Sequence, residues 1–283
     1  MTKMTKRIIA HLIGFVGASA LLIGSASAAG YPIDKPVAQS WSFAGIFGRY
    51  DRAQLQRGFQ VYAEVCQGCH GLQMIAFRNL AEPGGPEFSE AAAKAIAAEY
   101  TVMDGPDSEG EMFERPARLS DTFPVPFANK EAAAASNNGA VPPDFSLIAK
   151  ARGVERGFPW FIFDIVTQYQ EGGADYIHGL LTNYKDAPEG VTVDDGTYYN
   201  TGFIAGKTLA MAPPLEDESV DYTDGSPMTL DQYSRDVTAF LMWAAEPKLE
   251  ERKRIGFQAM IFMIIFAGMM YLVKRKIWSK TEH

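Results

Sequence analysis

Residues 66–70 read Cys-Gln-Gly-Cys-His, and these five residues bear on the fold more directly than any other stretch of the chain. Two thiols at this spacing can each form a thioether with one vinyl group of a haem. The imidazole of the next residue then lies under the ring and can bind the iron. We therefore expect a covalently attached haem c at Cys66 and Cys69, with His70 as an axial ligand of the iron.

Three other interpretations of this stretch use the same cysteines. A thioredoxin-like redox pair places its first cysteine at the start of a helix, whereas residues 52–65 have the apolar spacing of a helix that ends there. A zinc site needs four ligands, and after the N-terminal segment the chain has three histidines, at positions 70, 178 and 283. A structural disulfide gives the neighbouring histidine no role. Haem attachment is the interpretation that uses all three side chains.

The iron also needs a second axial ligand or an open position. Seven side chains between the two ends of the chain are candidates: Met74, Met103, Met112, Met211, Met228, Met242 and His178. Met74 follows His70 by one helical turn, so it would stay on the same face of the ring. Met211 precedes Pro213 and Pro214, which predict an extended loop that can carry a sulfur to the far face. Residue chemistry favours Met211 and leaves the others open.

Both ends of the chain carry membrane signals. Residues 1–28 have a basic start, an apolar run and a closing Ala26-Ser27-Ala28, which predicts a cleaved signal peptide. Ile255–Val273 is 19 residues long without a charge, and a basic cluster with Trp278 follows it. This pattern predicts a single transmembrane helix with a stop-transfer cluster. We expect an exported haem domain at 29–250, and an anchor with a short cytoplasmic tail at 251–283.

Apolar periodicity predicts a few helices in the exported domain. Residues 52–65 and 229–245 each carry one apolar stripe, and Thr229 can cap the second helix. Packing these two stripes together would hold the haem between segments that are distant in sequence. Residues 89–100 predict an alanine-rich helix, and the aromatic segment 158–169 is either a core helix or an exposed contact surface. Most of the remainder is predicted to be loop, above all at 104–110, 116–139 and 187–196.

The formal net charge of −8 is unevenly distributed. Basic residues gather in the first 28 residues and from Arg252 onward, so the region between them is strongly acidic. Such a field repels nucleic acid and attracts a basic protein partner. One acidic stretch is a candidate docking cluster: Glu216, Asp217, Glu218, Asp221 and Asp224.

Motifs along nearly the whole mature chain resemble the cytochrome c1 family, the haem subunits of cytochrome bc1 complexes. The motifs flank the haem cysteines and recur towards the anchor; they include 57–62, 76–80, 104–106, 110–113, 137–140, 142–146, 172–176, 180–184, 211–214 and 240–248. The resemblance implies a mainly α fold, namely a cytochrome c-like haem domain with long ordered loops and one C-terminal transmembrane helix. Residues 153–171 are an insertion relative to the simplest form of the family pattern.

The resemblance also assigns roles to particular residues. It implies that Met211 is the sixth ligand of the iron and that Pro142 and Pro143 lie at the haem edge. Arg152 matches an arginine that faces a haem propionate, which is chemically reasonable because a guanidinium offsets a carboxylate. Tyr176 matches a tyrosine on the other side of the same pocket.

By the same resemblance, the chain is an electron-transfer subunit. It would take single electrons from the Rieske iron–sulfur protein and pass them through its haem to a soluble or tethered cytochrome c. The cytochrome b subunit would hold the anchor in the bacterial inner membrane, in a dimeric complex, with the haem domain on the periplasmic side. Two alternatives remain from the residues alone: a free membrane-tethered electron carrier, and a haem enzyme or sensor with an open sixth position.

Overall fold

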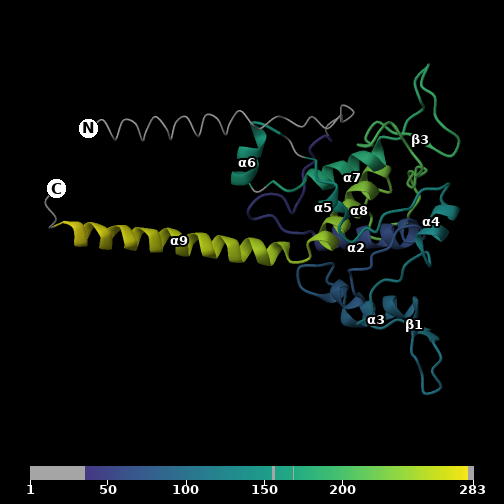
Figure 1. Ribbon diagram of the computed structural model, residues 1–283, viewed down its shortest axis with the longest axis horizontal. Coiled ribbons are helices and arrows are strands. Elements are labelled where there is room, and N and C mark those ends of the chain that lie inside the picture. The colour runs from purple at the N-terminus through teal and green to yellow at the C-terminus, as the bar shows by residue number, and fades with distance from the viewer. Residues whose placement is uncertain (1–35, 155–156, 168, 280–283) are drawn as a thin grey trace, which may run out of the picture. The chain divides into compact units, whose positions relative to one another are not determined.

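The computed structural model describes residues 36–154, 157–167 and 169–279, all within one compact unit (Figure 1). Its helices are α2 (Arg52–Val61), η1 (Tyr62–Cys66), η2 (Phe77–Ala81), α3 (Glu90–Ala98), α4 (Lys130–Ser136), α5 (Ile148–Ala151), α6 (Trp160–Thr167), α7 (Gly172–Thr182), α8 (Leu230–Ala245) and α9 (Leu249–Trp278). Its strands form two short antiparallel pairs, β1 (Thr101–Asp104) with β2 (Phe113–Pro116) and β3 (Tyr198–Tyr199) with β4 (Thr208–Leu209). The predicted mainly α fold is confirmed.

Helices α2 and α8 form the centre of the core, as their apolar stripes predicted. Asp51 caps α2 by accepting from the Gln54 amide, and Thr229 caps α8 in the same way. The two helices approach so closely that a Cβ at Gly58 would lie 2.0 Å from the carbonyl oxygen of Asp236. Glycine at position 58 therefore allows the contact that places α2, and the cysteines after it, against α8.

The last turn of the first helix widens into a π-helix. Gln67 donates its amide to the carbonyl oxygen of Tyr62 at 2.9 Å, which is a bond to the fifth residue back. Single π turns inside helices are frequent at functional sites because they insert one residue and redirect the chain beyond them. Here the π turn follows α2 and ends at Cys66 itself, so it sets the direction in which the chain continues towards Cys69.

A second layer joins α5, α7 and α8. Gly173 in α7 lies against α5 so tightly that a Cβ there would be 1.7 Å from the Ala149 carbonyl oxygen. Tyr176 and Ile177 of α7 are buried in the same core as α8. This layer was not predicted from apolar spacing, because the close helix contact depends on glycine, which carries no side chain to form a stripe.

Some regions predicted to be loop contain short elements. Helix α4 lies within the predicted loop 116–139, where Asn129 caps it by accepting from the Ala132 amide. Asp104 is the last residue of β1, and the rest of the predicted loop 104–110 leads round a turn towards β2. The alanine-rich helix α3 begins after Ser89, as predicted.

The long C-terminal helix α9 contains the predicted anchor and extends beyond it at both ends. It has 30 residues and is apolar enough to span a membrane. Its first turn belongs to the body of the domain: Leu249 is buried, and Glu250 forms an ion pair with Arg52 at 2.8 Å. The predicted signal peptide and the last four residues lie outside the described part of the chain.

Candidate haem-binding site

Cys66 ends the π-helix, and Cys69 lies on the tight turn that follows it. The amides of Cys69 and His70 both donate to the carbonyl oxygen of Cys66, at 3.1 and 2.9 Å. Both thiols are free, with Cys66 half-buried and Cys69 exposed. Burial raises the pKa of the Cys66 thiol to about 12, with a smaller contribution from Cys69. The two cysteines form no disulfide, and their spacing is the one that two thioether bonds to a haem need, so this donor set fits the group.

His70 is oriented by a backbone carbonyl. Its Nδ1 lies 2.8 Å from the carbonyl oxygen of Pro143, and its ring stacks on Phe145 with the centroids 3.9 Å apart. Because a carbonyl only accepts, Nδ1 carries the proton and Nε2 presents a lone pair. Burial lowers the pKa of His70, although the bond to Pro143 and the charge of Asp144 oppose this effect. The ring is thus held as the neutral tautomer that binds metals through Nε2.

The loop that supplies Pro143 is attached to the residues after His70. Phe145 donates its amide to the Gly71 carbonyl oxygen at 2.8 Å, and Gln73 donates its amide to the Asp144 carboxylate at 3.1 Å. The Met74 amide donates to the Ser146 hydroxyl at 3.0 Å. These bonds fix the distance between His70 and the Pro143 carbonyl. The sequence motif 142–146 indicated a haem edge but not this histidine contact, because a backbone carbonyl has no sequence signature.

Met211 lies on the loop that its neighbouring prolines predicted. It follows β4 after one residue, is half-buried, and precedes the buried Leu215. The hydroxyl of Tyr184 donates to the Met211 carbonyl oxygen at 3.1 Å. Tyr184 was not singled out from the sequence, and it fixes the backbone from which the Met211 sulfur projects.

Arg152 and Tyr176 lie near one another, at the end of α5 and on α7. Tyr176 is buried, which raises the pKa of its phenol, and a backbone contact at Ile204 and the charge of Arg152 partly offset this rise. Burial also raises the pKa of Tyr184, with a further contribution from Tyr176. Tyr176 therefore lies close to both Arg152 and Tyr184, and Tyr184 binds the Met211 loop. The segment from Pro143 to Arg152 links this group to His70.

The other candidate ligands occupy different settings. Met74, Met103 and Met112 are exposed, and Met242 is buried inside α8. His178 is buried, and its Nε2 lies 2.9 Å from the Asp231 carboxylate. Met211 differs from these candidates because it is half-buried on a loop outside the helices, and that loop is bound by Tyr184.

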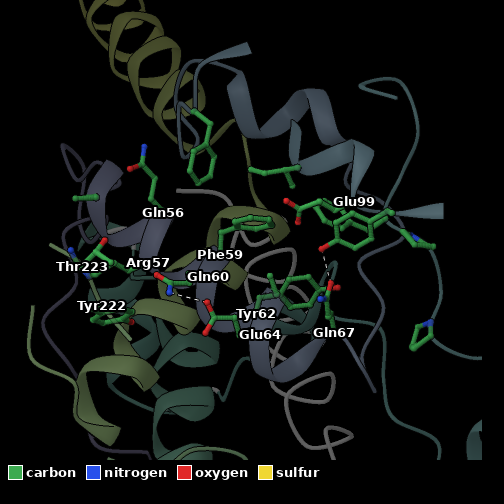
Figure 2. A pocket seen from close by; sticks show the side chains of 18 of the residues that line it. Gln56, Arg57, Phe59, Gln60, Tyr62, Glu64, Gln67, Glu99, Tyr222 and Thr223 are labelled. Carbon is green, nitrogen blue, oxygen red and sulfur yellow. Dashed lines mark hydrogen bonds between the residues drawn. The ribbon is translucent and has the colours of Figure 1, made fainter. Parts of the chain in front are cut away.

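A cavity of about 830 Å³ lies between α2, α3 and the loops at 123–126 and 222–224 (Figure 2). Its lining includes Gln67 but not His70, Met211 or Arg152. Polar groups on its wall bind one another: the Gln60 amide donates to Glu64, and the Tyr100 hydroxyl donates to Gln67. The cavity is thus separate from the proposed ligands.

We compared the sequence of the chain with those of known proteins and protein families. A family model described as the Cytochrome C1 family matches residues 41–281. The chain is 48% identical over 274 residues to "Cytochrome c1" of Blastochloris viridis, covering 95% of this chain and 96% of that protein. It is 40% identical to "Cytochrome c1" of Rhodospirillum rubrum, with 100% of both chains covered.

A third relative is a longer protein. The chain is 54% identical to "Cytochrome b/c1" of Bradyrhizobium diazoefficiens over 285 residues. The alignment covers 100% of this chain but spans 41% of that relative.

Proposed function

The chain belongs to the cytochrome c1 family, whose members carry one covalent haem c, and on this premise we propose that it is the electron-transfer subunit of a quinol–cytochrome c oxidoreductase (bc1) complex. When bound, the haem supplies one-electron chemistry between the Rieske iron–sulfur protein and a cytochrome c. The role of the polypeptide is to hold that group, to set its reduction potential and to dock its partners. It contributes no substrate-transforming site of its own.

The single observation that carries this proposal is the bond between His70 and Pro143. It leaves the Nε2 lone pair of His70 available as an axial ligand, directly after two cysteines that form no disulfide. We assign covalent attachment to Cys66 and Cys69, and the second axial position to Met211. A thioether in that position favours the reduced iron relative to a second histidine, and so raises the potential.

Arg152 and Tyr176 are proposed to hold the polar edge of the haem. Arg152 is exposed at the end of α5, and its charge is felt by Tyr176. A guanidinium in that place can bind a propionate in a charge-assisted hydrogen bond. Pro142 and Pro143 are proposed to cover the ring edge, where their lack of amide donors keeps the surface apolar.

The acidic stretch that follows Met211 is proposed to receive a basic cytochrome c. All five members of the cluster are exposed, but Asp217 accepts from the Leu230 amide and Asp224 pairs with Arg57. Glu216, Glu218 and Asp221 are therefore the members best placed to steer a partner. Helix α9 is proposed to pack against cytochrome b, with residues 29–250 in the periplasm, the tail in the cytoplasm, and the complex dimeric.

Purification in a mild detergent tests the assignment to a complex. The chain should elute with a b-type haem and an iron–sulfur protein, and its own haem should resist extraction with acidified acetone. Elution of a red chain alone would instead favour the free membrane-tethered carrier. A colourless polypeptide after extraction would contradict covalent attachment.

Steering by the acidic cluster is tested by replacing Glu216, Glu218 and Asp221 with their amides. The bimolecular rate of cytochrome c reduction should fall at low salt, and its dependence on ionic strength should flatten. The matched control replaces Glu189, Asp194 and Asp195 with their amides, which removes the same number of charges from the separate loop before β3. Equal effects of both sets would indicate net charge rather than a docking surface.

A further inference from the structure

We propose that the insertion carrying α6, together with the loop before α2, forms a second contact with the membrane, in the interfacial layer of the lipid beside the anchor. Large apolar side chains on both segments face outwards: Phe47 is 73% exposed, Phe158 81%, Trp160 52%, Ile162 49% and Phe163 55%. We call these five residues, with the exposed Ile46, the interfacial patch. The sequence left open whether 158–169 is core or surface, and its exposure favours surface.

Contacts with the first turns of α9 place the interfacial patch at the membrane end of the domain. Arg252 donates to the side-chain oxygen of Gln170, three residues after α6, at 3.3 Å. Phe47 packs edge-on against Phe257 with the ring centroids 5.3 Å apart. Lys253 donates to the Phe43 carbonyl oxygen at 2.6 Å. Both segments are thus attached to α9 where its polar first turn meets its apolar run, and Figure 1 shows α6 on the side of the domain from which α9 leaves.

The depth of these contacts matches the interfacial layer. Arg252 and Phe257 are separated by about 7.5 Å along a helix, which is comparable with the polar layer on each side of a bilayer's hydrocarbon core. The uncharged run of α9 begins at Ile255, between these two residues. Anything attached at Arg252 and Phe257 therefore lies at the level of the lipid headgroups and the outermost acyl carbons.

The composition of the interfacial patch suits lipid better than water. Tryptophan is enriched at the membrane–water boundary, and helices that lie in this layer carry tryptophan, phenylalanine and leucine on their apolar face. The described side chains of α6 include one charged group, the half-buried Asp164, so the helix meets the membrane through apolar contact rather than through basic residues. An apolar surface continuous with a membrane anchor is most simply covered by the same membrane.

A spin label at Ile162 measures this contact directly. The chain has two cysteines, and haem attachment would protect both from the label, so Ile162→Cys offers one reactive thiol. The intact complex is reconstituted in phospholipid nanodiscs, and collision of the label with oxygen is compared with collision with a water-soluble nickel chelate. We expect the oxygen-to-nickel accessibility ratio to be several-fold higher than for the matched exposed control Met112→Cys, in the turn between β1 and β2.

Two other outcomes of the accessibility measurement would contradict the proposal. A ratio equal to that of Met112→Cys would show that the interfacial patch is hydrated. Low accessibility to both reagents would show that another subunit covers it. A second variant, Phe163→Glu in the Ile162→Cys background, should lower the ratio while leaving haem content unchanged, and no change would also overturn the proposal. Labelling of the unsubstituted chain would contradict haem attachment instead, so the two hypotheses fail separately.

Discussion

The carbonyl of Pro143 accepts from Nδ1 of His70 and so leaves Nε2 as the nitrogen that can face an iron. The residues around this carbonyl hold it in position. Asp144 and Ser146 bind the backbone just beyond His70, at Gln73 and Met74. Replacing either of these side chains would loosen the carbonyl without touching the imidazole. The site is thus built as much from main-chain geometry as from the five residues of the attachment motif.

Met211→Leu tests the second ligand at the residue scale. Leucine keeps the volume and apolar character of the site but removes the sulfur, so we expect covalent haem to be retained. The reduction potential should fall by about 100 mV or more, a fraction of the ~0.8 V that axial ligands can span. Redox titration of the haem absorbance measures the change. Met74→Leu is the control, because Met74 is exposed near His70. An unchanged potential in Met211→Leu would remove it from the ligand role.

His178 predicts a pH dependence of stability. Burial lowers its pKa from the usual 6.5, and this effect outweighs the opposing bond and charge of Asp231; Arg235 lowers the pKa further and Asp175 raises it. A histidine that binds its proton less readily when folded stabilises the protein above its unfolded pKa and loses that contribution as the pH falls through its folded pKa. Denaturant midpoints measured from pH 7 to pH 5 should therefore fall. In His178→Phe the slope should be smaller, and an identical slope would exclude His178 as a cause.

The chemistry of single residues was largely predictable, whereas the contacts that position them were not. The motif at 66–70 and the prolines after Met211 each have a direct chemical interpretation. Tyr184 and the Pro143 carbonyl act through hydrogen bonds between segments 27 and 73 residues apart. Such pairings depend on the folded path of the chain, and local periodicity carries no information about them.

At the scale of elements, one buried carboxylate joins the two central helices. Asp236 of α8 is fully buried and accepts from Arg57 of α2 at 2.8 Å, while Tyr222 and Gln54 donate to it as well. The apolar stripes of α2 and α8 predicted that they would pack. Their register is specified by this polar cluster and by Gly58, neither of which is part of a stripe.

Asp236→Ala should destabilise the domain by about 3–5 kcal/mol, because it leaves the mostly buried Arg57 without its main partner. Urea unfolding monitored by circular dichroism measures the loss. Asp224→Ala is the matched control: it removes a partner of the same arginine, but Asp224 is exposed, so the cost should be below about 1 kcal/mol. Equal costs would mean that burial of Asp236 is not the source of the pair's importance.

Two glycines of α7 offer a comparison within one helix. Alanine at position 173 would meet the Ala149 carbonyl oxygen at 1.7 Å, whereas at position 179 the nearest atom is the flexible Asn183 amide at 3.6 Å. Gly173→Ala should therefore cost about 1–3 kcal/mol by pushing α5 from α7. Gly179→Ala should be neutral or stabilising by up to about 1 kcal/mol, since alanine favours helices. Thermal unfolding of both variants measures these changes in stability. A Gly173→Ala variant as stable as the unsubstituted chain would show that α5 can move freely.

At the scale of the whole molecule, the sequence predicted the boundary between the haem domain and its anchor only approximately. Hydropathy predicted an anchor helix from about residue 255, because charged residues precede that position. The structure extends the same helix back to Leu249. The first turn of this helix exposes polar side chains to solvent and also contacts the domain. A hydropathy average over a window of residues does not detect such a turn.

Two truncations separate these roles. A chain ending at Arg254 keeps Leu249 in the core, Glu250 on Arg52 and the ion pair between Arg252 and Glu246. A chain ending at Lys248 loses all three. Both should leave the membrane as red soluble domains, since the interfacial patch alone supports at most weak reversible binding.

The shorter chain should be less stable by about 3 kcal/mol, because it exposes the surface that Leu249 covers and loses two partly exposed ion pairs. Urea unfolding followed through the haem absorbance and the backbone circular dichroism compares the two domains directly. Equal stability would show that the first turn of α9 serves the anchor rather than the domain. If the chain ending at Arg254 stayed firmly in the membrane, α9 would not be its sole attachment, and an uncleaved N-terminal segment or a stronger interfacial patch would have to hold it there.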